Sequence, residues 1–244
     1  MWGKISEIKR KRNRKYKTAI LVVEVLLGLL FLYVGEKAQI GQGIKPGEPV
    51  ISESIIGEKE NRKIALTFDD GPHPCYTEQL LDGLKERGVH VTFFVTGYHA
   101  ELHPDVIRRM QEEGHLIGNH TYSHIQLRSD NREKFKEELL RTNEIIRNIT
   151  GEDTLYVRPP YGTWDKSMEE EVNMFPVLWT VDPLDWCSDN VACVVAKVEE
   201  KAGENDIILM HDYYESSVTA ALKIVDEFLE EGYTFVTVDE ILFD

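Results

Sequence analysis

The chain has 244 residues, which is enough for one sizeable domain and a short appendage. Its 42% hydrophobic and 29% charged residues are ordinary for a globular protein and exclude wholesale disorder. Residues 1–17 hold eight Lys/Arg and one Glu, whereas the residues after 34 carry a net charge of −21, which argues against a nucleic acid or another anionic polymer as ligand.

An apolar run, TAILVVEVLLGLLFLYV, covers residues 18–34 and follows the basic segment directly. As a helix it spans roughly 25 Å, slightly less than a bilayer core of about 30 Å. We expect a single-pass signal-anchor in the cell membrane, with residues 1–17 in the cytoplasm and everything after 34 outside. A cleaved signal peptide is the alternative, but the run is long for one, and only the distant Gly41–Gly43 segment resembles a cleavage site. Residues 35–62 are polar and Gly/Pro-rich, which predicts a linker.

Strand-like and helix-like segments alternate from residue 63 onward. Strands are predicted at 63–68, 91–95, 115–118, 154–157, 176–180, 206–210 and 233–236, and helices at 76–87, 104–113, 131–149, 165–174, 190–201 and 215–231. Because parallel neighbours need crossovers, this order predicts an α/β fold with a mostly parallel sheet. Seven strands favour a distorted, incomplete (β/α)7 barrel over a six-stranded open sheet, although periodicity alone leaves both open. In either fold the active site lies at the C-terminal ends of the strands.

Five of the seven predicted strands lead into motifs of ionisable and aromatic residues. In chain order these are TFDDG, NHTYSH, RPPYG, VDPLDW and MHD. Because parallel strands end on one rim, these side chains are expected to gather there, as the groups of a hydrolytic site do.

His120 and His124 have the i, i+4 spacing that places two imidazoles on one side of a helical turn, a spacing used by metal sites. Two histidines alone are a weak signal, and a carboxylate from a neighbouring strand end is the natural third ligand. Two histidines, one carboxylate and an open position are typical of catalytic zinc.

Asp69 and Asp70 are adjacent at a strand end, so their side chains are expected to point to opposite sides and to do different work. One can ligate a metal while the other accepts a proton from water. Opposite orientation also argues against a glycosidase pair, whose two carboxyls flank a sugar bond about 5–9.5 Å apart.

Taken together, TFDDG, HTYSH, RPPY, DPLDW and LMH occur in the order found in polysaccharide deacetylases with a NodB-homology domain, which form carbohydrate esterase family 4. The resemblance covers roughly residues 62–242 and makes residues 63–244 the catalytic domain. It implies that Asp70, His120 and His124 bind one divalent metal ion, zinc or in some members cobalt or another ion. It further implies that Asp69 is the general base for the attacking water and that Arg158 orients Asp69.

The resemblance assigns the remaining tasks to residues of the later motifs. His211 is the implied general acid that protonates the departing amine, and Asp185 fixes its tautomer. The backbone N–H of Tyr161 is the implied oxyanion donor, and Trp186 and Leu209 line the slot for the acetyl methyl group.

The function implied by this resemblance is metal-dependent removal of N-acetyl groups from an amino sugar polymer. Outside a cell with a single membrane, the nearest such polymer is peptidoglycan, and its N-acetylglucosamine is the expected substrate. Chitooligosaccharide deacetylase, muramic acid deacetylase and O-acetyl xylan esterase use the same machinery and stay open. A non-catalytic glycan-binding protein is disfavoured because every ligand and catalytic position is present. We expect a monomer that binds an acetylated cell-wall glycan and no nucleic acid.

Three cysteines are an odd number for an extracellular protein, and no CxxC pair is present, so a thiolate metal site is not expected. Either one disulfide or none is possible, with Cys75–Cys187 and Cys187–Cys193 as candidate bridges. Cys193 lies among valines and is predicted to be a core residue. Five histidines match no motif and receive no role: His73, His90, His99, His103 and His115.

Overall fold

The computed structural model describes residues 62–243, which belong to one compact unit. The predicted cytoplasmic tail (1–17) and signal-anchor (18–34) lie outside these residues, as does the predicted linker except for Arg62. Within 62–243, no helix has the length and apolarity needed to cross a membrane.

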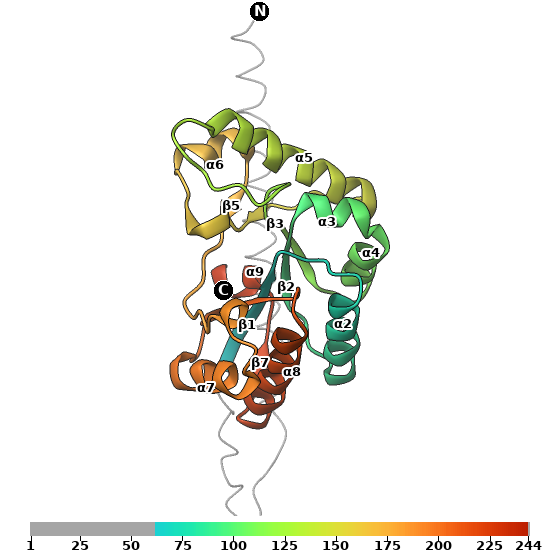
Figure 1. Cartoon of the computed structure of the whole chain (residues 1–244), viewed down its shortest axis with the longest axis vertical. Helices are drawn as coiled ribbons and strands as arrows, with labels where there is room; N and C mark the ends of the chain where they lie inside the picture. Colours follow the sequence, from blue (N-terminus) through green and yellow to red (C-terminus); the bar gives the residue numbers. More distant parts are fainter. Residues whose placement is uncertain (1–61, 244) are drawn as a thin grey trace, which may run out of the picture. The chain divides into compact units, whose positions relative to one another are not determined.

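In this part of the chain, seven strands form one sheet in which every pairing is parallel. The order is β5-β4-β3-β2-β1-β6, and β7 pairs with the first residues of β1. Figure 1 labels five of these strands, β1, β2, β3, β5 and β7. After β5, a bridge between Val181 and Ile208 links the chain back to β6, so the sheet curls into an incomplete barrel. The predicted distorted (β/α)7 barrel is confirmed. The strands are β1 (Arg62–Asp69), β2 (Thr92–Val95), β3 (Leu116–Asn119), β4 (Tyr156–Val157), β5 (Phe175–Pro176), β6 (Ile207–His211) and β7 (Tyr233–Phe235).

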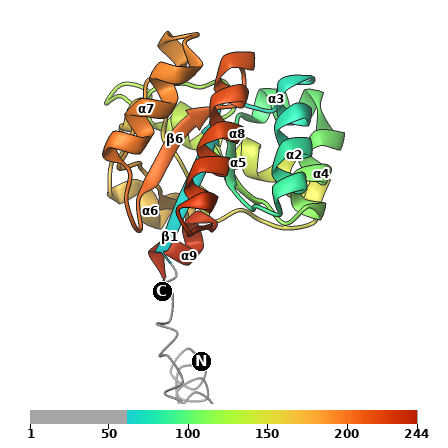
Figure 2. The same cartoon turned by 90° about the horizontal axis from the view of Figure 1, so that it is seen from below.

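Helices fill the crossovers, and α2, α7 and α8 lie around the β1–β6 side of the sheet (Figure 2). All six predicted helices are present, with ends that differ by at most two residues from the prediction: α2 (Tyr76–Arg87), α4 (Pro104–Glu112), α5 (Arg132–Thr150), α6 (Ser167–Val172), α7 (Val191–Lys201) and α8 (Glu215–Glu230). The sequence prediction missed α3 (Gly97–Leu102) and α9 (Val238–Leu242), which are too short to show a helical period. Two 3₁₀ turns, η1 (Pro160–Gly162) and η2 (Asp185–Cys187), follow β4 and β5.

The side chains of β1 point alternately to the helix-covered face of the sheet and to the interior of the barrel. Its even-numbered residues from Ile64 to Phe68 are fully or almost fully buried in the core that α2 and α8 cover. Its odd-numbered residues from Ala65 to Asp69 point to the other face, because successive strand residues alternate. The barrel interior therefore receives a buried carboxylate from β1.

The fully buried Arg158, directly after β4, lies in this interior. Its guanidinium packs over the ring of Phe94, 4.2 Å from the centroid, and donates to the backbone oxygens of Val177 at 3.1 Å and Leu178 at 3.2 Å. These two carbonyls belong to the strand predicted at 176–180. Strand β5 ends at Pro176, these two carbonyls accept from Arg158 instead of from a neighbouring strand, and the bridge at Val181 resumes the pairing.

The three cysteines are free and exposed, so both candidate bridges are wrong. The prediction of Cys193 as a core residue is also wrong. Helix α7 buries Val194, Val195 and Val198, and Cys193 lies one position off that face.

Candidate metal centre and active site

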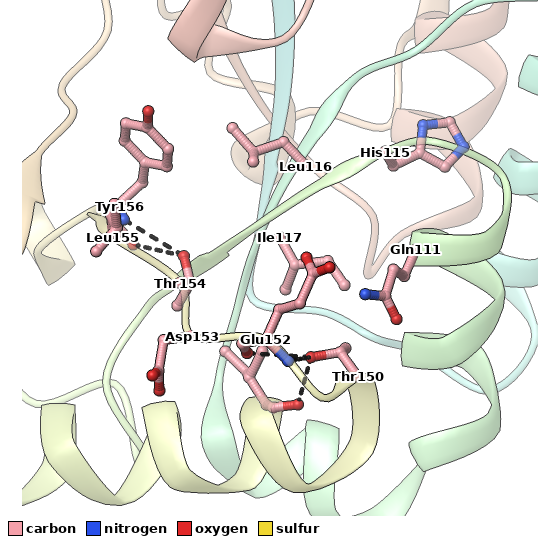
Figure 3. Close-up of a pocket in the computed structure, with 11 residues that line it drawn as sticks. Gln111, His115, Leu116, Ile117, Thr150, Glu152, Asp153, Thr154, Leu155 and Tyr156 are labelled. Atoms are coloured by element: carbon pink, nitrogen blue, oxygen red, sulfur yellow. Dashed lines mark hydrogen bonds between the residues drawn. The ribbon is translucent and has the colours of Figure 1, made fainter.

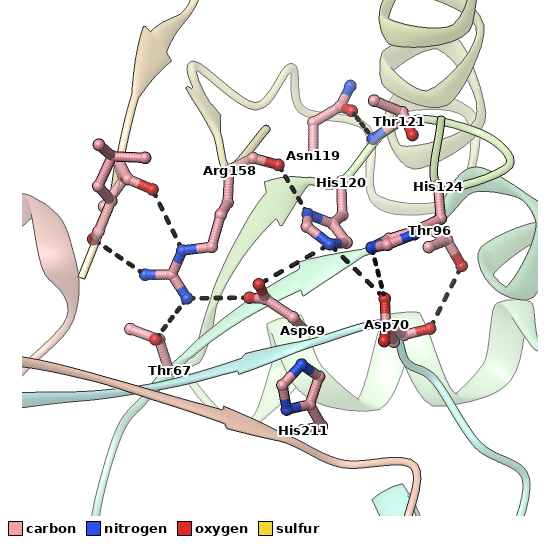
Figure 4. Close-up of polar contacts among 12 residues, drawn as sticks. Thr67, Asp69, Asp70, Thr96, Asn119, His120, Thr121, His124, Arg158 and His211 are labelled. Carbon is pink, nitrogen blue, oxygen red and sulfur yellow. Dashed lines mark hydrogen bonds and ion pairs between the residues drawn. The ribbon is translucent and has the colours of Figure 1, made fainter. Parts of the chain in front are cut away.

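The site lies at the C-terminal ends of the strands, as predicted (Figure 4). Strand β1 supplies Asp69 and leads into Asp70, β3 leads into His120 and His124, and β4 leads into Arg158. Strand β6 ends in His211, which lies in register with Asp69 on β1. Parallel pairing thus brings residues far apart in sequence to one rim.

Three candidate ligand atoms converge beside Asp69. Asp70 Oδ1 lies 3.6 Å from His120 Nε2 and 3.5 Å from His124 Nε2, and all three ligand atoms lie within 4.8 Å of one another. In tetrahedral coordination with metal–ligand bonds of about 2.0–2.1 Å, two ligand atoms lie about 3.4 Å from each other. The spacing and the N/O donor set therefore fit a divalent metal ion.

The tautomer of His120 is set by the backbone. Its Nδ1–H donates to the Arg158 carbonyl at 2.6 Å, so Nε2 carries the lone pair that faces Asp70. Burial lowers the pKa of His120 to about 3, against the charge of Asp70, and keeps the imidazole neutral. A neutral imidazole held in this way is ready to bind a metal.

The two histidines meet through a loop, and their predicted placement on a helical turn is wrong. Residues 120–124 contain no helix, and Thr121 and His124 have positive φ angles of 62° and 56°. The Thr121 N–H donates to Asn119 Oδ1 at 2.8 Å, which holds the reversal of the chain. The imidazole centroids lie 4.9 Å apart.

The prediction that Asp69 and Asp70 point to opposite sides is also wrong. Asp70 leaves the strand with a φ of 77°, and this turns its side chain back toward the carboxylate of Asp69. Asp69 Oδ2 and Asp70 Oδ1 lie 3.7 and 3.6 Å from the same atom, His120 Nε2 (Figure 4). The two residues differ in their surroundings instead, because the Asp69 side chain is 5% exposed and that of Asp70 is 34% exposed.

Asp69 is held by the buried guanidinium of Arg158. One Arg158 nitrogen donates to Asp69 Oδ1 at 2.9 Å and to Thr67 Oγ1 at 2.6 Å. Burial raises the pKa of Asp69, although the charges of Arg158 and His211 and the Arg158 hydrogen bond act against the rise. The second oxygen, Oδ2, faces the His120 Nε2 atom and is the one placed to accept a proton beside the ligand cluster.

His211 is oriented by Asp185, which η2 brings to the rim. The His211 Nδ1–H donates to Asp185 Oδ1 and its backbone N–H to Asp185 Oδ2, both at 2.9 Å. Burial acts to lower the pKa of His211, but the hydrogen bond and charge of Asp185, with the charges of Asp69 and Asp70, raise it to about 9. The imidazole is therefore a proton donor at neutral pH.

The remaining predicted site residues line the same pocket as the ligands. Tyr161 has a φ of 60°, and its ring centroid is 5.0 Å from that of His124. Trp186 is 54% exposed at the rim and Leu209 is buried at the base. Every predicted site residue thus lies in the pocket or holds a residue that does.

Sequence reasoning missed residues on both sides of this pocket. Trp179, Asp182 and Tyr214 also line it. His99 Nδ1 lies 2.8 Å from the Asp70 carbonyl oxygen and Thr96 Oγ1 3.3 Å, so these residues brace the loop that carries a predicted ligand. Both follow β2, so the strand-end rule would have found them if the end of the second strand had been included.

A buried carboxylate with no predicted role lies behind the same loop. Asp212 is fully buried, accepts a hydrogen bond from Thr77 Oγ1, and has one oxygen without a hydrogen-bond partner. Gly71 packs against it so closely that a Cβ at this position would lie 2.2 Å from Asp212 Oδ2. The glycine of the Asp-Asp-Gly sequence is therefore required by packing.

Another pocket lies at the opposite end of the strands, where β3 and β4 begin (Figure 3). The hydroxyl of Thr150 there donates to the carbonyls of Ile146 and Glu152, and that of Thr154 accepts from the Tyr156 N–H. These two hydroxyls serve the local turns, and the group of residues that could hold a metal among 62–243 lies at the other end of the strands.

Comparison with known proteins identifies a family. The model for the polysaccharide deacetylase family matches residues 56–177. The peptidoglycan-N-acetylmuramic acid deacetylase PdaC of Bacillus subtilis is 38% identical over 200 residues, which are 81% of this chain and 43% of that protein. The peptidoglycan-N-acetylglucosamine deacetylase PgdA of Listeria monocytogenes is 37% identical over 183 residues, 75% of this chain and 39% of that protein.

The solved structure of Bacillus subtilis PdaC has the same fold, with a TM-score of 0.72 and 38% identity, and the match covers 75% of this chain and 91% of that one. The chain spans about two fifths of the length of the two curated relatives.

Proposed function

The chain belongs to the polysaccharide deacetylase family, and we propose that it removes N-acetyl groups from the amino sugars of peptidoglycan, N-acetylglucosamine first, with the help of a divalent metal ion. One observation carries the proposal. The cluster of Asp70, His120 and His124 lies beside a buried carboxylate held by an arginine and within one pocket with a histidine held by a carboxylate. Amide hydrolysis requires a proton acceptor and a proton donor next to the bound metal ion, and this arrangement provides both beside the three candidate ligands.

Asp70, His120 and His124 would hold the divalent cation, which when bound would polarise the acetyl carbonyl and lower the pKa of water. We assign the ion as zinc, because two imidazoles and one carboxylate with an open position are a donor set that catalytic zinc uses.

Asp69 acts as the general base. Its Oδ2 takes a proton from the attacking water while the water oxygen forms a bond to the acetyl carbon. Arg158 keeps this carboxylate in place through Oδ1 and balances its charge in the barrel interior. Because Oδ1 is occupied by the ion pair with Arg158, Oδ2 is the Asp69 oxygen that accepts the proton.

His211 acts as the general acid. It gives its proton to the amide nitrogen as the C–N bond breaks, so that the products are acetate and a free amine on the sugar. The proton gained by Asp69 and the one lost by His211 balance over the cycle. Asp185 holds the donor in the protonated state between turnovers.

The substrate acetyl group is positioned by residues at the rim and base of the pocket. The backbone N–H of Tyr161 stabilises the oxyanion, an interaction worth about 2.7–4 kcal/mol in related chemistry. Trp186 and Leu209 enclose the methyl group. We further propose that residues 18–34 anchor the enzyme in the cell membrane and that it acts as a monomer on the extracellular cell wall.

N-acetylmuramic acid is a second candidate substrate. The relative that matches over the larger share of this chain is named as a muramic acid deacetylase. The two sugars alternate in peptidoglycan, so an assay on this one polymer tests both candidate substrates.

The proposal is tested with the full chain, zinc and a panel of purified peptidoglycan, chitooligosaccharides and acetylated xylan. We expect acetate release from peptidoglycan, and mass spectrometry of the digested product identifies the sugar that has lost its acetyl group. Acetate from xylan alone would contradict the proposal.

Asp185→Asn is expected to move the alkaline limit of activity downward. His211 must be protonated to act, so activity is present below its pKa of about 9 and is lost as the pH rises through that value. Without the Asp185 charge the limit moves by about one pH unit or more toward the ordinary histidine value of about 6.5. The measurement is kcat/KM against pH, with the exposed Asp189→Asn in the same loop as control. An unchanged alkaline limit in Asp185→Asn would contradict the assigned acid.

A further inference from the structure

One buried carboxylate at the rim of the barrel takes no part in the proposed reaction. The acidic residues buried among 62–243 are Asp69, Asp185 and Asp212, and of these only Asp212 has no assigned role. It follows His211 at the end of β6, and its side chain accepts a hydrogen bond from Thr77 Oγ1 on α2. Because burial of a carboxylate costs free energy, its presence next to the site indicates a task there.

The carboxyl of Asp212 packs against the backbone of Gly71, which follows the candidate ligand Asp70. Both residues belong to the segment 70–75 that connects β1 to α2, which we call the Asp70 loop. A Cβ on Gly71 would lie 2.2 Å from Asp212 Oδ2 and 2.4 Å from Oδ1, so the carboxyl fills the space directly behind this backbone. Close packing of this kind prevents Gly71 from moving toward β6.

The hydroxyl of Thr77 connects Asp212 to the far end of the same loop. Thr77 is fully buried in the first turn of α2, and its hydroxyl donates to Asp212 Oδ2 and accepts from the His73 N–H at 2.8 Å. His73 Nδ1 in turn accepts from the N–H groups of Cys75 and Tyr76 at 3.2 and 3.1 Å. The second half of the Asp70 loop is thus a hydrogen-bonded turn that the Thr77 hydroxyl joins to the end of β6.

The other side of the Asp70 loop is held from the end of β2. The Asp70 carbonyl accepts from His99 Nδ1–H at 2.8 Å and from Thr96 Oγ1 at 3.3 Å. The Gly71 carbonyl accepts from the Thr96 N–H at 3.1 Å. Between these supports Asp70 has a φ of 77°, a conformation that persists only where the surroundings hold it. Loss of one support is therefore expected to let the Asp70 carboxylate move away from the two imidazoles.

We infer that Asp212 is a positioning residue for the divalent cation. By filling the space behind Gly71 and by holding Thr77, it fixes the turn that presents the Asp70 carboxylate to the two imidazoles. The inference rests on the proposed function, because it takes the cluster that contains Asp70 as the metal site. It makes the hydrogen bond between Thr77 and Asp212 a determinant of zinc affinity, although neither residue belongs to that cluster.

The test measures the Kd for zinc of the full chain and its variants by competition with a chelator of known affinity. Thr77→Val removes the hydroxyl and keeps the shape of the side chain, Thr77→Ser keeps the hydroxyl, and Asp212→Ala removes its partner. The matched control is Thr142→Val, which also removes a fully buried threonine hydroxyl, but one without a hydrogen-bond partner. Thermal melting without metal shows whether each variant folds, and acetate release from peptidoglycan is measured at saturating zinc.

We expect Thr77→Val and Asp212→Ala to weaken zinc binding about 10- to 100-fold, the loss seen when a supporting contact of a metal ligand is removed. Thr77→Ser and Thr142→Val are expected to keep the parent Kd. Excess zinc is expected to restore turnover in the two weakened variants, because their ligands are all present. If Asp212→Ala does not fold, the comparison of Thr77→Val with Thr77→Ser decides.

Parent zinc affinity in Thr77→Val and Asp212→Ala, in a chain that releases acetate, would overturn the inference and leave the proposed function standing. An equal loss of affinity in Thr77→Ser and Thr77→Val would also overturn it, since the hydroxyl would then not be the cause. Weakened zinc binding in Thr77→Val and Asp212→Ala, in a chain that releases no acetate, would support the inference while the proposed function fails. A parent chain that binds no zinc overturns the two together.

Discussion

Asp69→Asn is expected to lower kcat by about 10²- to 10⁴-fold while the protein keeps its metal, since a general base contributes about that much. The amide keeps the shape of the carboxylate and can still accept the Arg158 hydrogen bond, but it cannot take a proton from water. The cluster of Asp70, His120 and His124 does not include Asp69, so zinc content is expected to stay at the parent level. The measurements are kcat on peptidoglycan and zinc per chain by mass spectrometry.

The matched control for this variant is Asp206→Asn, at the opposite end of the barrel, where the carboxylate accepts a hydrogen bond from the Gly203 N–H. It is expected to keep the parent kcat. Full turnover by Asp69→Asn with normal metal content would show that another group takes the proton.

His120→Ala is expected to lose both metal and turnover. The side chain is almost fully buried, and its Nε2 atom faces Asp70 with the lone pair fixed by the Arg158 carbonyl. Removing it deletes one of three candidate ligands, so zinc affinity is expected to fall by at least about 10- to 100-fold, the loss seen when only a supporting contact is removed. The measurements are zinc titration and acetate release.

His124→Ala separates loss of the ligand from loss of the fold, because this side chain is one-third exposed and its removal disturbs packing less. It is expected to show the same loss of zinc and activity, while its thermal melting curve matches that of the parent when both are measured without metal. His90→Ala, an exposed histidine that precedes β2, is the control with parent zinc affinity. Parent-like zinc affinity in both His120→Ala and His124→Ala would place the metal elsewhere.

The sequence predicted that the five strand-end motifs gather in one place because parallel strands all end on one rim, and the resemblance to the family then implied which of their residues form the site. TFDDG and MHD are far apart along the chain, yet the pairing of β1 with β6 sets Asp69 opposite His211. The strand assignment places these motifs on one rim, and the order of the strands, which the structure supplies, makes Asp69 and His211 neighbours.

The local geometry was not predictable, because it depends on backbone conformations that residue propensities disfavour. Seven non-glycine residues among 62–243 have positive φ, a conformation uncommon for any residue except glycine, and two of them are asparagines outside the site. The other five all lie in the loops of the site: Asp70, Thr121, His124, Tyr161 and Leu184. Sequence rules assume ordinary strand and helix geometry, so they gave wrong reasons for the pairing of His120 with His124 and for the different roles of the two aspartates.

These conformations also explain how two adjacent aspartates come to lie in different surroundings, as their proposed roles require. The left-handed turn at Asp70 brings both carboxylates to one histidine nitrogen. The buried Arg158 then fixes Asp69, while Asp70 faces both imidazoles. Surroundings, and not alternation along the strand, separate the proposed base from the proposed metal ligand.

The most direct test of a metal-dependent deacetylase is acetate release from purified peptidoglycan by the full chain, after treatment with a chelator and during titration with zinc. Metal dependence through the single cluster of Asp70, His120 and His124 predicts no release after chelation and full recovery at about one zinc per chain. Acetate release that survives complete removal of the metal would contradict it.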